Sequence, residues 1–144
     1  MAMKIYFAGS IRGGRQDKEL YLELIKHLQL YGEVLTEHVG ERKLTAFGEN
    51  LTNDEYIFRR DISWVNEADV FIAEVTQPSL GVGYELVIAQ SLGKKILCLY
   101  KPQEGRRLSA MISGNKGLTI KQYTELPEAF AMIDKFFQLF AKEF

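Results

Sequence analysis

A hydroxyl and a carboxylate, Ser79 and Glu85, lie in a turn that follows a short apolar run of the chain. The run, residues 69–75, is rich in β-branched and apolar side chains, which is typical of a parallel strand buried on both faces. Open α/β sheets bind ligands at the carboxyl ends of such strands, where the winding of the chain reverses. We therefore interpret residues 76–85 as an active-site turn whose hydroxyl and carboxylate face a ligand. The alternative, which this stretch alone leaves open, is a glycine-rich turn with a solvated glutamate.

Other residues of this turn shape its backbone. Pro78 ends the strand, and Gly81 and Gly83 remove side chains where a ligand would approach the main chain. The next segment, residues 82–92, is apolar on nearly every side and is followed by Gly93, so we expect a buried helix with a glycine stop. This helix would hold the carboxylate of the active-site turn in its first turn.

A second candidate turn follows the first predicted strand, residues 4–8, and precedes a helix expected from about residue 17. A strand, a glycine-bearing turn and a helix start form a common phosphate site, because free backbone N–H groups and the helix dipole both favour an anion. Ser10 would add a hydroxyl and Arg12 a forked cation, although a solvated loop arginine is the alternative. In a sheet of order 2-1-3-4-5, this turn would face the Ser79 turn across one crevice.

Two further side chains are candidates because of their positions. His38 follows a short predicted strand, residues 33–37, and either lines the site or stays solvated; we favour the site. Asp61 lies near the apolar boundary of a helix predicted from about residue 54 to residue 67, and its pattern alone favours the surface.

Strands and helices alternate along the chain. This order predicts one α/β domain, residues 1–144, with a doubly wound, five-stranded parallel sheet of the Rossmann or flavodoxin-like kind and helices on both faces. The remaining predicted strands are residues 95–100 and 118–123, with a short helix at 108–112 between them. The last helix, residues 126–140, has an apolar surface wider than one face, which indicates either another subunit or deeper burial in the same chain.

The overall composition argues against several classes of protein. The 144 residues carry a net charge of -1, which gives no electrostatic basis for binding a nucleic-acid polymer or a membrane. No apolar run reaches membrane-spanning length, and the N-terminus leads into a strand rather than a signal peptide. We therefore expect a cytoplasmic protein, with the nucleus as the alternative. The single cysteine, Cys98, lies in an apolar strand and is expected to be an inert core residue.

Four separated motifs together resemble one known family. They are residues 6–15, 35–38, 73–85 and 108–112. In their order and spacing they are similar to the motifs of the 2'-deoxynucleoside 5'-phosphate N-hydrolases, a branch of the nucleoside 2-deoxyribosyltransferase superfamily. The resemblance implies an N-glycosidase that cleaves a deoxynucleoside monophosphate to a free base and 2-deoxyribose 5-phosphate. It also implies no metal and no organic cofactor.

The resemblance assigns three residues to the chemistry. Glu85 matches the family's nucleophile, which forms a covalent deoxyribosyl intermediate that water resolves. Asp61 matches the second catalytic carboxylate, which handles the base and its proton, and Tyr6 matches the tyrosine that positions the nucleophile. We expect the helix dipole to keep Glu85 ionised, and apolar neighbours to raise the pKa of Asp61 so that it donates a proton. This division of work between two carboxyl groups is that of a retaining glycosidase.

The resemblance also implies a pocket for the 5'-phosphate. It would contain Ser10, Arg12 and Ser79, together with Ser109 from the other subunit of a homodimer. Forked and hydroxyl donors of this kind suit a dianion. The alternatives are a transferase that passes the sugar to a second base, and a nucleotide-binding module without turnover. The other positions that match the substrate pocket are Gly9, Ile11, His38, Gly81, Gly83 and Met111.

Overall fold

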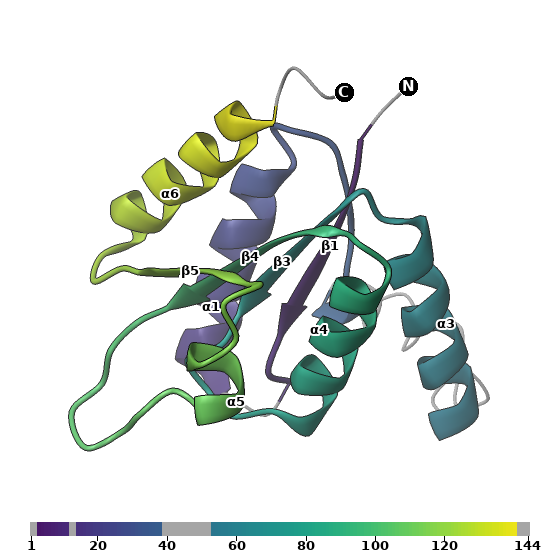
Figure 1. The fold of residues 1–144 in the computed structure, drawn as a ribbon, viewed down its shortest axis with the longest axis horizontal. Helices are drawn as coiled ribbons and strands as arrows, with labels where there is room; N and C mark the ends of the chain where they lie inside the picture. The colour runs from purple at the N-terminus through teal and green to yellow at the C-terminus, as the bar shows by residue number, and fades with distance from the viewer. Residues whose placement is uncertain (1–2, 12–13, 39–52, 141–144) are drawn as a thin grey trace.

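A five-stranded parallel sheet lies at the centre of the molecule, and helices cover both of its faces (Figure 1). The structure is a computed structural model that describes residues 3–11, 14–38 and 53–140. The strands are ordered β2-β1-β3-β4-β5, so the predicted order 2-1-3-4-5 and the predicted fold class are confirmed. The strands are β1 (Lys4–Gly9), β2 (Glu33–Leu35), β3 (Val70–Glu74), β4 (Lys95–Tyr100) and β5 (Thr119–Gln122).

The helices begin where the sequence provides partners for their first N–H groups. Asn53 caps one helix by accepting a hydrogen bond from the Tyr56 amide at 2.7 Å. Ser79 caps the next by accepting one from the Val82 amide at 3.2 Å. None of the helices in the described ranges is long and apolar enough to cross a membrane. The helices are α1 (Gly14–Leu28), α3 (Asp54–Glu67), α4 (Leu80–Ser91), α5 (Ala110–Ser113) and α6 (Leu126–Leu139).

The core has two layers, one on each face of the sheet. Helices α1 and α6 pack on one face, with Phe7 and Ile72 of the sheet among the buried residues. Helices α3 and α4 cover the other face, where Tyr6 and Phe71 are buried (Figure 1). Every residue of β3 is buried, as expected for the middle strand of the sheet. Cys98 is a free, buried residue of β4, as predicted.

The apolar faces of two helices differ from the expectation. Residues 82–92 were expected to be buried on nearly every side, but Tyr84 and Val87 are exposed, Val87 by 63%. Leu80, at the start of α4, is 97% exposed. The prediction was wrong because the sheet covers only one side of α4. The wide apolar surface of α6 is explained by burial within the same chain, because Phe136 is buried against Phe137 and Phe140. Leu139 at the end of α6 is 75% exposed, but the larger group of exposed apolar side chains belongs to α4.

Candidate active site

A cavity of about 920 Å³ opens at the carboxyl ends of β1 and β3. These two strands are neighbours in the sheet, and the chain leaves them toward opposite faces, so this is the switch point at which α/β sheets bind ligands. Both candidate turns of the sequence contribute to the cavity, as expected. Its lining consists of Ser10, Ile11, Glu37, Asp54, Ile57, Phe58, Asp61, Ile62, Pro78, Ser79, Leu80, Gly81, Tyr84 and Glu85.

Glu85 enters the cavity from α4, one turn later than expected. Because Ser79 is the N-cap, the helix begins at Leu80 rather than at Val82, and its first turn contains no acidic residue. Glu85 therefore lies in the second turn, where the N-terminal dipole has little effect on a carboxylate. The expected place of Glu85 in the first turn was wrong because the Ser79 cap starts the helix two residues early.

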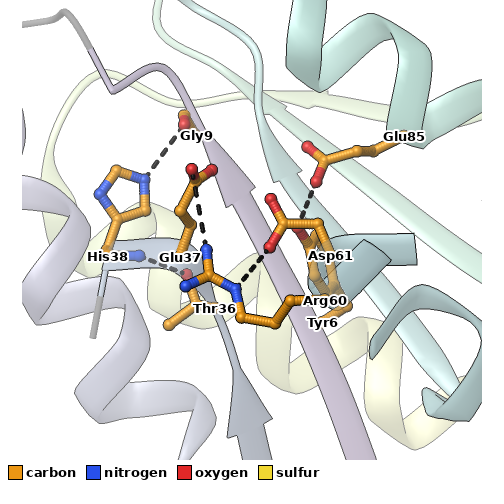
Figure 2. A network of polar contacts seen from close by, with 8 residues as sticks. All are labelled: Tyr6, Gly9, Thr36, Glu37, His38, Arg60, Asp61 and Glu85. Atoms are coloured by element: carbon orange, nitrogen blue, oxygen red, sulfur yellow. Dashed lines mark hydrogen bonds and ion pairs between the residues drawn. The ribbon is translucent and has the colours of Figure 1, made fainter. Parts of the chain in front are cut away.

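The carboxylate of Glu85 is held by a tyrosine from the neighbouring strand. The Tyr6 hydroxyl donates a hydrogen bond to Glu85 Oε2 (Figure 2). Tyr6 itself is almost fully buried in β1, and its ring stacks on Phe71 of β3 with 5.3 Å between the ring centroids. The core of the sheet therefore fixes the position of the phenol, and the phenol orients one oxygen of the carboxylate.

Asp61 lies beside this pair, in α3. The pattern of the helix favoured the surface, and that expectation was wrong, since Asp61 is only 7% exposed. Its Oδ1 accepts a hydrogen bond from Nε of Arg60 at 3.0 Å. Figure 2 shows the carboxyl groups of Asp61 and Glu85 on the same side of β1, with Asp61 entering from α3 and Glu85 from α4.

Burial makes both carboxyl groups weak acids. The pKa of Glu85 is raised to about 8, chiefly by loss of solvent and then by the charges of Asp61 and Glu37, while the Tyr6 hydrogen bond opposes the shift. The pKa of Asp61 is also raised by burial, against the effect of Arg60. We expected the helix dipole to keep Glu85 ionised; burial outweighs it in the free protein. The pair therefore retains a proton at neutral pH, as two close carboxyl groups do.

Two further carboxyl groups, those of Glu37 and Asp54, line the same cavity, and the sequence reasoning gave neither a role. Glu37 directly precedes His38 in the motif after β2, so its place at the end of a strand was the available signal. Arg60, which is adjacent to Asp61, was also missed. Within residues 3–11, 14–38 and 53–140, no group of three or more His, Cys, Asp or Glu side chains is arranged to hold a metal ion.

Two of the predicted phosphate ligands share the cavity. Ser10 is buried at the end of β1, and Ser79 lies opposite at the start of α4. Ser79 Oγ accepts the Val82 amide, which leaves its O–H group free to donate. A Cβ atom added to Gly81 would meet only Ser79 Oγ, at 3.9 Å, so there is room beside this turn. Arg12, the predicted cationic ligand, lies outside the described residues.

His38 and Gly9 support the cavity from behind. A ring nitrogen of His38, Nε2, is 3.1 Å from the carbonyl oxygen of Gly9 (Figure 2). The His38 ring also packs edge-on against Tyr21. A Cβ atom at residue 9 would lie 3.0 Å from the Tyr21 ring, so a larger residue there would press on that ring. Neither residue belongs to the cavity lining, and His38 instead fixes the turn that follows β1.

Ser109, Met111 and Gly83 line a second cavity, of about 610 Å³, between α4 and α5. Ser109 is the N-cap of α5, and its Oγ accepts the Met111 amide at 3.2 Å. Ser79 lines both cavities, so the active-site turn separates them. Within one chain, Ser109 and Met111 are therefore not part of the cavity that contains Glu85.

The active-site turn is anchored on the other face of the sheet by Glu74. This carboxyl group is 1% exposed and accepts hydrogen bonds from the Thr76 amide and the Thr76 hydroxyl, both at 2.8 Å. The Tyr123 hydroxyl also donates to it. Burial raises the pKa of Glu74, and these hydrogen bonds oppose the rise. Glu74 thus links the start of the turn to the end of β5.

Residues 5–123 match the family described as nucleoside 2-deoxyribosyltransferase. The chain belongs to this family. A 5-hydroxymethyl-dUMP N-hydrolase from Tetraodon nigroviridis is 58% identical over 113 residues, which are 78% of this chain and 80% of the relative. One from Rattus norvegicus is 49% identical over 140 residues, which are 94% of this chain and 85% of the relative.

The fold of the family is also seen in solved structures. A 2-deoxyribosyltransferase from Bacillus psychrosaccharolyticus has a TM-score of 0.65 and 20% identity to this chain. The match covers 88% of this chain and 90% of that protein. At this identity the likeness supports the fold alone.

Proposed function

We propose that this chain is a single catalytic domain that hydrolyses the N-glycosidic bond of 2'-deoxynucleoside 5'-monophosphates. The observation that carries the proposal is the pair of carboxyl groups, Glu85 and Asp61, in one cavity, with Glu85 oriented by the Tyr6 phenol. The products are a free base and 2-deoxyribose 5-phosphate. The names of the relatives from Tetraodon nigroviridis and Rattus norvegicus support the same reaction class.

In the first step, Glu85 acts as the nucleophile and Asp61 as the acid. A carboxylate oxygen of Glu85 bonds to the anomeric carbon while the bond from that carbon to the base breaks. The electron pair of the broken bond leaves with the base, which takes a proton from Asp61. The raised pKa of Asp61 favours the protonated form that this step requires. The product on the protein is a deoxyribosyl ester of Glu85.

In the second step, water resolves the ester. The water oxygen attacks the anomeric carbon while Asp61, now ionised, takes a proton from this water. The ester bond to Glu85 breaks, and Glu85 departs as a carboxylate. The hydrogen bond from Tyr6 stabilises this carboxylate. Both carboxyl groups thus return to their initial protonation states, and the sugar keeps its anomeric configuration.

The phosphate would bind at the two turns. Ser10 and Ser79 both line the cavity and both have hydroxyl donors, and Arg12 follows Ser10 by two residues in the sequence. These groups suit the dianionic 5'-phosphate. A 2'-hydroxyl would destabilise the cationic transition state and crowd Glu85, so the deoxy sugar is preferred. We propose that Gly81 leaves space for the substrate beside the same turn.

The base is proposed from the relatives. The names of the relatives from Tetraodon nigroviridis and Rattus norvegicus give 5-hydroxymethyl-dUMP, which makes this nucleotide the first substrate to test here. Glu37 and Phe58 also line the cavity and are candidates to contact the base. A nucleoside monophosphate is a metabolite of the cell interior, so we place the activity in the cytoplasm or the nucleus.

We further propose a homodimer in which Ser109 reaches the site of the other subunit. Exposed apolar side chains on three neighbouring helices support a partner surface there, including Leu80 of α4 and Met111 of α5, which is 85% exposed. The partner would cover the cavity between α4 and α5 and bring its own Ser109 to the Ser79 turn.

Mixed dimers would test this arrangement. A dimer of one Glu85→Gln chain and one Ser109→Ala chain has one intact site if Ser109 acts in the other subunit, and no intact site if it acts in its own. Recovery of activity on mixing the two variants is therefore expected. No recovery in a verified mixed dimer would contradict the trans arrangement.

Three substrates compared side by side test the proposed function. Free base is measured by chromatography after incubation with 5-hydroxymethyl-dUMP, the matching ribonucleotide and the unphosphorylated deoxynucleoside; dGMP, GMP and deoxyguanosine form a second set. Base from the deoxynucleotides alone is expected. Release mainly from the deoxynucleosides would contradict the phosphate pocket, and no release from any substrate would favour a binding module.

The family itself supports transfer as the second candidate function. In this reaction a second base, rather than water, would attack the deoxyribosyl ester of Glu85. Addition of a free acceptor base to the assay separates the two, because only transfer yields a new nucleotide.

A further inference from the structure

Arg60 is a buried cation behind the acidic side of the cavity. It precedes Asp61 in α3, and its side chain is only 9% exposed. The guanidinium lies over the Trp64 ring, with its central carbon 4.7 Å from the ring centroid, and more loosely over the Tyr56 ring. Such stacking fixes the plane of a guanidinium. Arg60 does not line the cavity that contains Glu85, so it is not placed to touch a substrate there.

The guanidinium faces two of the four carboxyl groups that line the cavity; the other two are those of Glu85 and Asp54. Its Nε donates to Asp61 Oδ1 at 3.0 Å, and Nη2 is 3.8 Å from Glu37 Oε1 (Figure 2). Within the part of the chain that the structure describes, the buried Nη1 and Nη2 atoms have no hydrogen-bond partner. A buried guanidinium with such poor hydrogen bonding is costly unless nearby negative charge offsets the cost. The acidic groups of the cavity supply that charge.

We propose that Arg60 is a positioning residue that orients Asp61 and sets the ionisation of the acidic group Glu37, Asp61 and Glu85. Its role in catalysis rests on the proposed function, whereas its role in ionisation does not. Arg60 from α3 and Tyr6 from β1 donate hydrogen bonds to this acidic cluster, and Asp54 from the start of α3 lines the same cavity. Arg60 is thus the one cation among them in the described residues.

The direction of the effect follows from the charge. A cation favours the ionised form of a carboxyl group, and Arg60 lowers the pKa of both Asp61 and Glu85 against the larger effect of burial. Loss of Arg60 therefore raises both pKa values. Ionisation of Glu85 as nucleophile sets the acidic limb of the pH profile, and protonation of Asp61 as acid sets the alkaline limb. Both limbs move to higher pH together.

The test is the pH profile of kcat/KM for Arg60→Gln, with Arg59→Gln as the matched control. Arg59 is the adjacent arginine of the same helix, but it is exposed and pairs with Glu55. We expect both limbs to move upward by about 1 pH unit in Arg60→Gln and to stay in place in Arg59→Gln. The titration of the substrate phosphate is common to all variants and cancels in the comparison. Arg60→Lys keeps the positive charge but lacks the forked guanidinium group. The limbs of its kcat/KM profile should lie close to those of the wild type.

A merely structural role gives a different result. It would lower kcat/KM at every pH without moving the limbs, and this outcome in folded Arg60→Gln would overturn the proposal. If Arg60→Gln fails to fold, the decision passes to Arg60→Met, which also removes the charge but keeps a long side chain against the Trp64 ring. Limbs that move upward in folded Arg60→Met support the proposal, and limbs that stay in place overturn it.

A measurement without substrate separates this proposal from the proposed function. Carbon-13 NMR of labelled side-chain carboxyl groups follows the titration of Asp61 and Glu85 in the free protein. Higher carboxyl pKa values in Arg60→Gln than in Arg59→Gln are expected whether or not the protein releases base. Base release from the wild type with identical carboxyl titrations in both variants would leave the function standing and overturn the role of Arg60.

Discussion

The phenol of Tyr6 in β1 donates a hydrogen bond to the carboxylate of Glu85 in α4, so this bond links the sheet to the helix that covers it. The bond lies where burial raises the pKa of Glu85 to about 8. It stabilises the ionised form, which is the form that the proposed nucleophile needs. The pH dependence of the reaction should therefore depend on this bond.

Replacement of Tyr6 by phenylalanine should move the acidic limb of kcat/KM to higher pH. The wild-type limb is expected near pH 8, and loss of the hydrogen bond raises the pKa of Glu85 further. At pH 7 a smaller fraction of Glu85 is ionised, so kcat/KM should fall about tenfold. Tyr31→Phe is the control, because it removes a tyrosine–carboxylate bond to Asp134, far from the cavity. An unmoved limb in Tyr6→Phe would contradict the assignment.

Replacement of Glu85 by glutamine should abolish the covalent step. A glutamine amide is a poor nucleophile, so kcat should fall by roughly 10³-fold or more. Mass spectrometry of acid-quenched protein should show a deoxyribose-phosphate adduct on the wild type and none on this variant. Glu67→Gln, at an exposed site in α3, is the control and should retain the adduct. Full base release by Glu85→Gln would remove the nucleophile assignment.

Replacement of Ser10 by alanine should weaken binding of the phosphate selectively. A hydrogen bond to a charged group contributes about 1.5–3 kcal/mol, so KM for the deoxynucleoside monophosphate should rise at least about tenfold. KM for the unphosphorylated deoxynucleoside should change little. Ser91→Ala, at the far end of α4, is the control. An equal rise in KM for both substrates would argue against a phosphate contact.

Replacement of Tyr123 by phenylalanine should destabilise the protein more at neutral than at acidic pH. The buried Glu74 loses one of its donors, which costs about 1–3 kcal/mol when Glu74 is ionised. Its pKa, already raised by burial, rises further, so the folded state disfavours the ionised form. The loss should be small at about pH 3, where Glu74 is mostly protonated in both the folded and the unfolded state.

Thermal unfolding across this pH range measures the effect. Tyr100→Phe, a buried tyrosine on the other face of the sheet, should show no such pH dependence. A Tyr123→Phe penalty that stays constant from acidic to neutral pH would show that the ionisation of Glu74 is not involved.

The sheet was predictable because each strand is an apolar run between turn residues, and this pattern depends on the chain's own periodicity. The convergence of Ser10 and Ser79 followed from the strand order alone. Asp61 was placed wrongly by pattern because its burial comes from β1 and from Arg60, which the periodicity of α3 does not report. Glu37 was missed for the same reason, since its neighbours lie on other elements.

Two errors concern α4. Its start was misplaced because a serine that seemed free to face a ligand also caps the helix, and this moves Glu85 from the first turn to the second. Its burial was overestimated because an apolar sequence does not say whether the sheet or another surface covers each side. The ionisation of Glu85 was also not predictable from the sequence, because the loss of solvent that raises its pKa depends on the assembled cavity.

The parallel pairing of β1 with β3 also has a consequence for how the protein folds. Ile5 pairs with Val70 and Tyr6 with Phe71, so this pairing closes a long loop of chain. The entropy lost in closing the loop is offset only when these long-range contacts have formed. Tyr6 and Glu85 meet only after that closure, whereas α1, α3 and α4 are stabilised by short-range contacts. Enzymatic activity regained on dilution from denaturant therefore follows the slow, long-range phase of refolding, later than the recovery of helical circular dichroism.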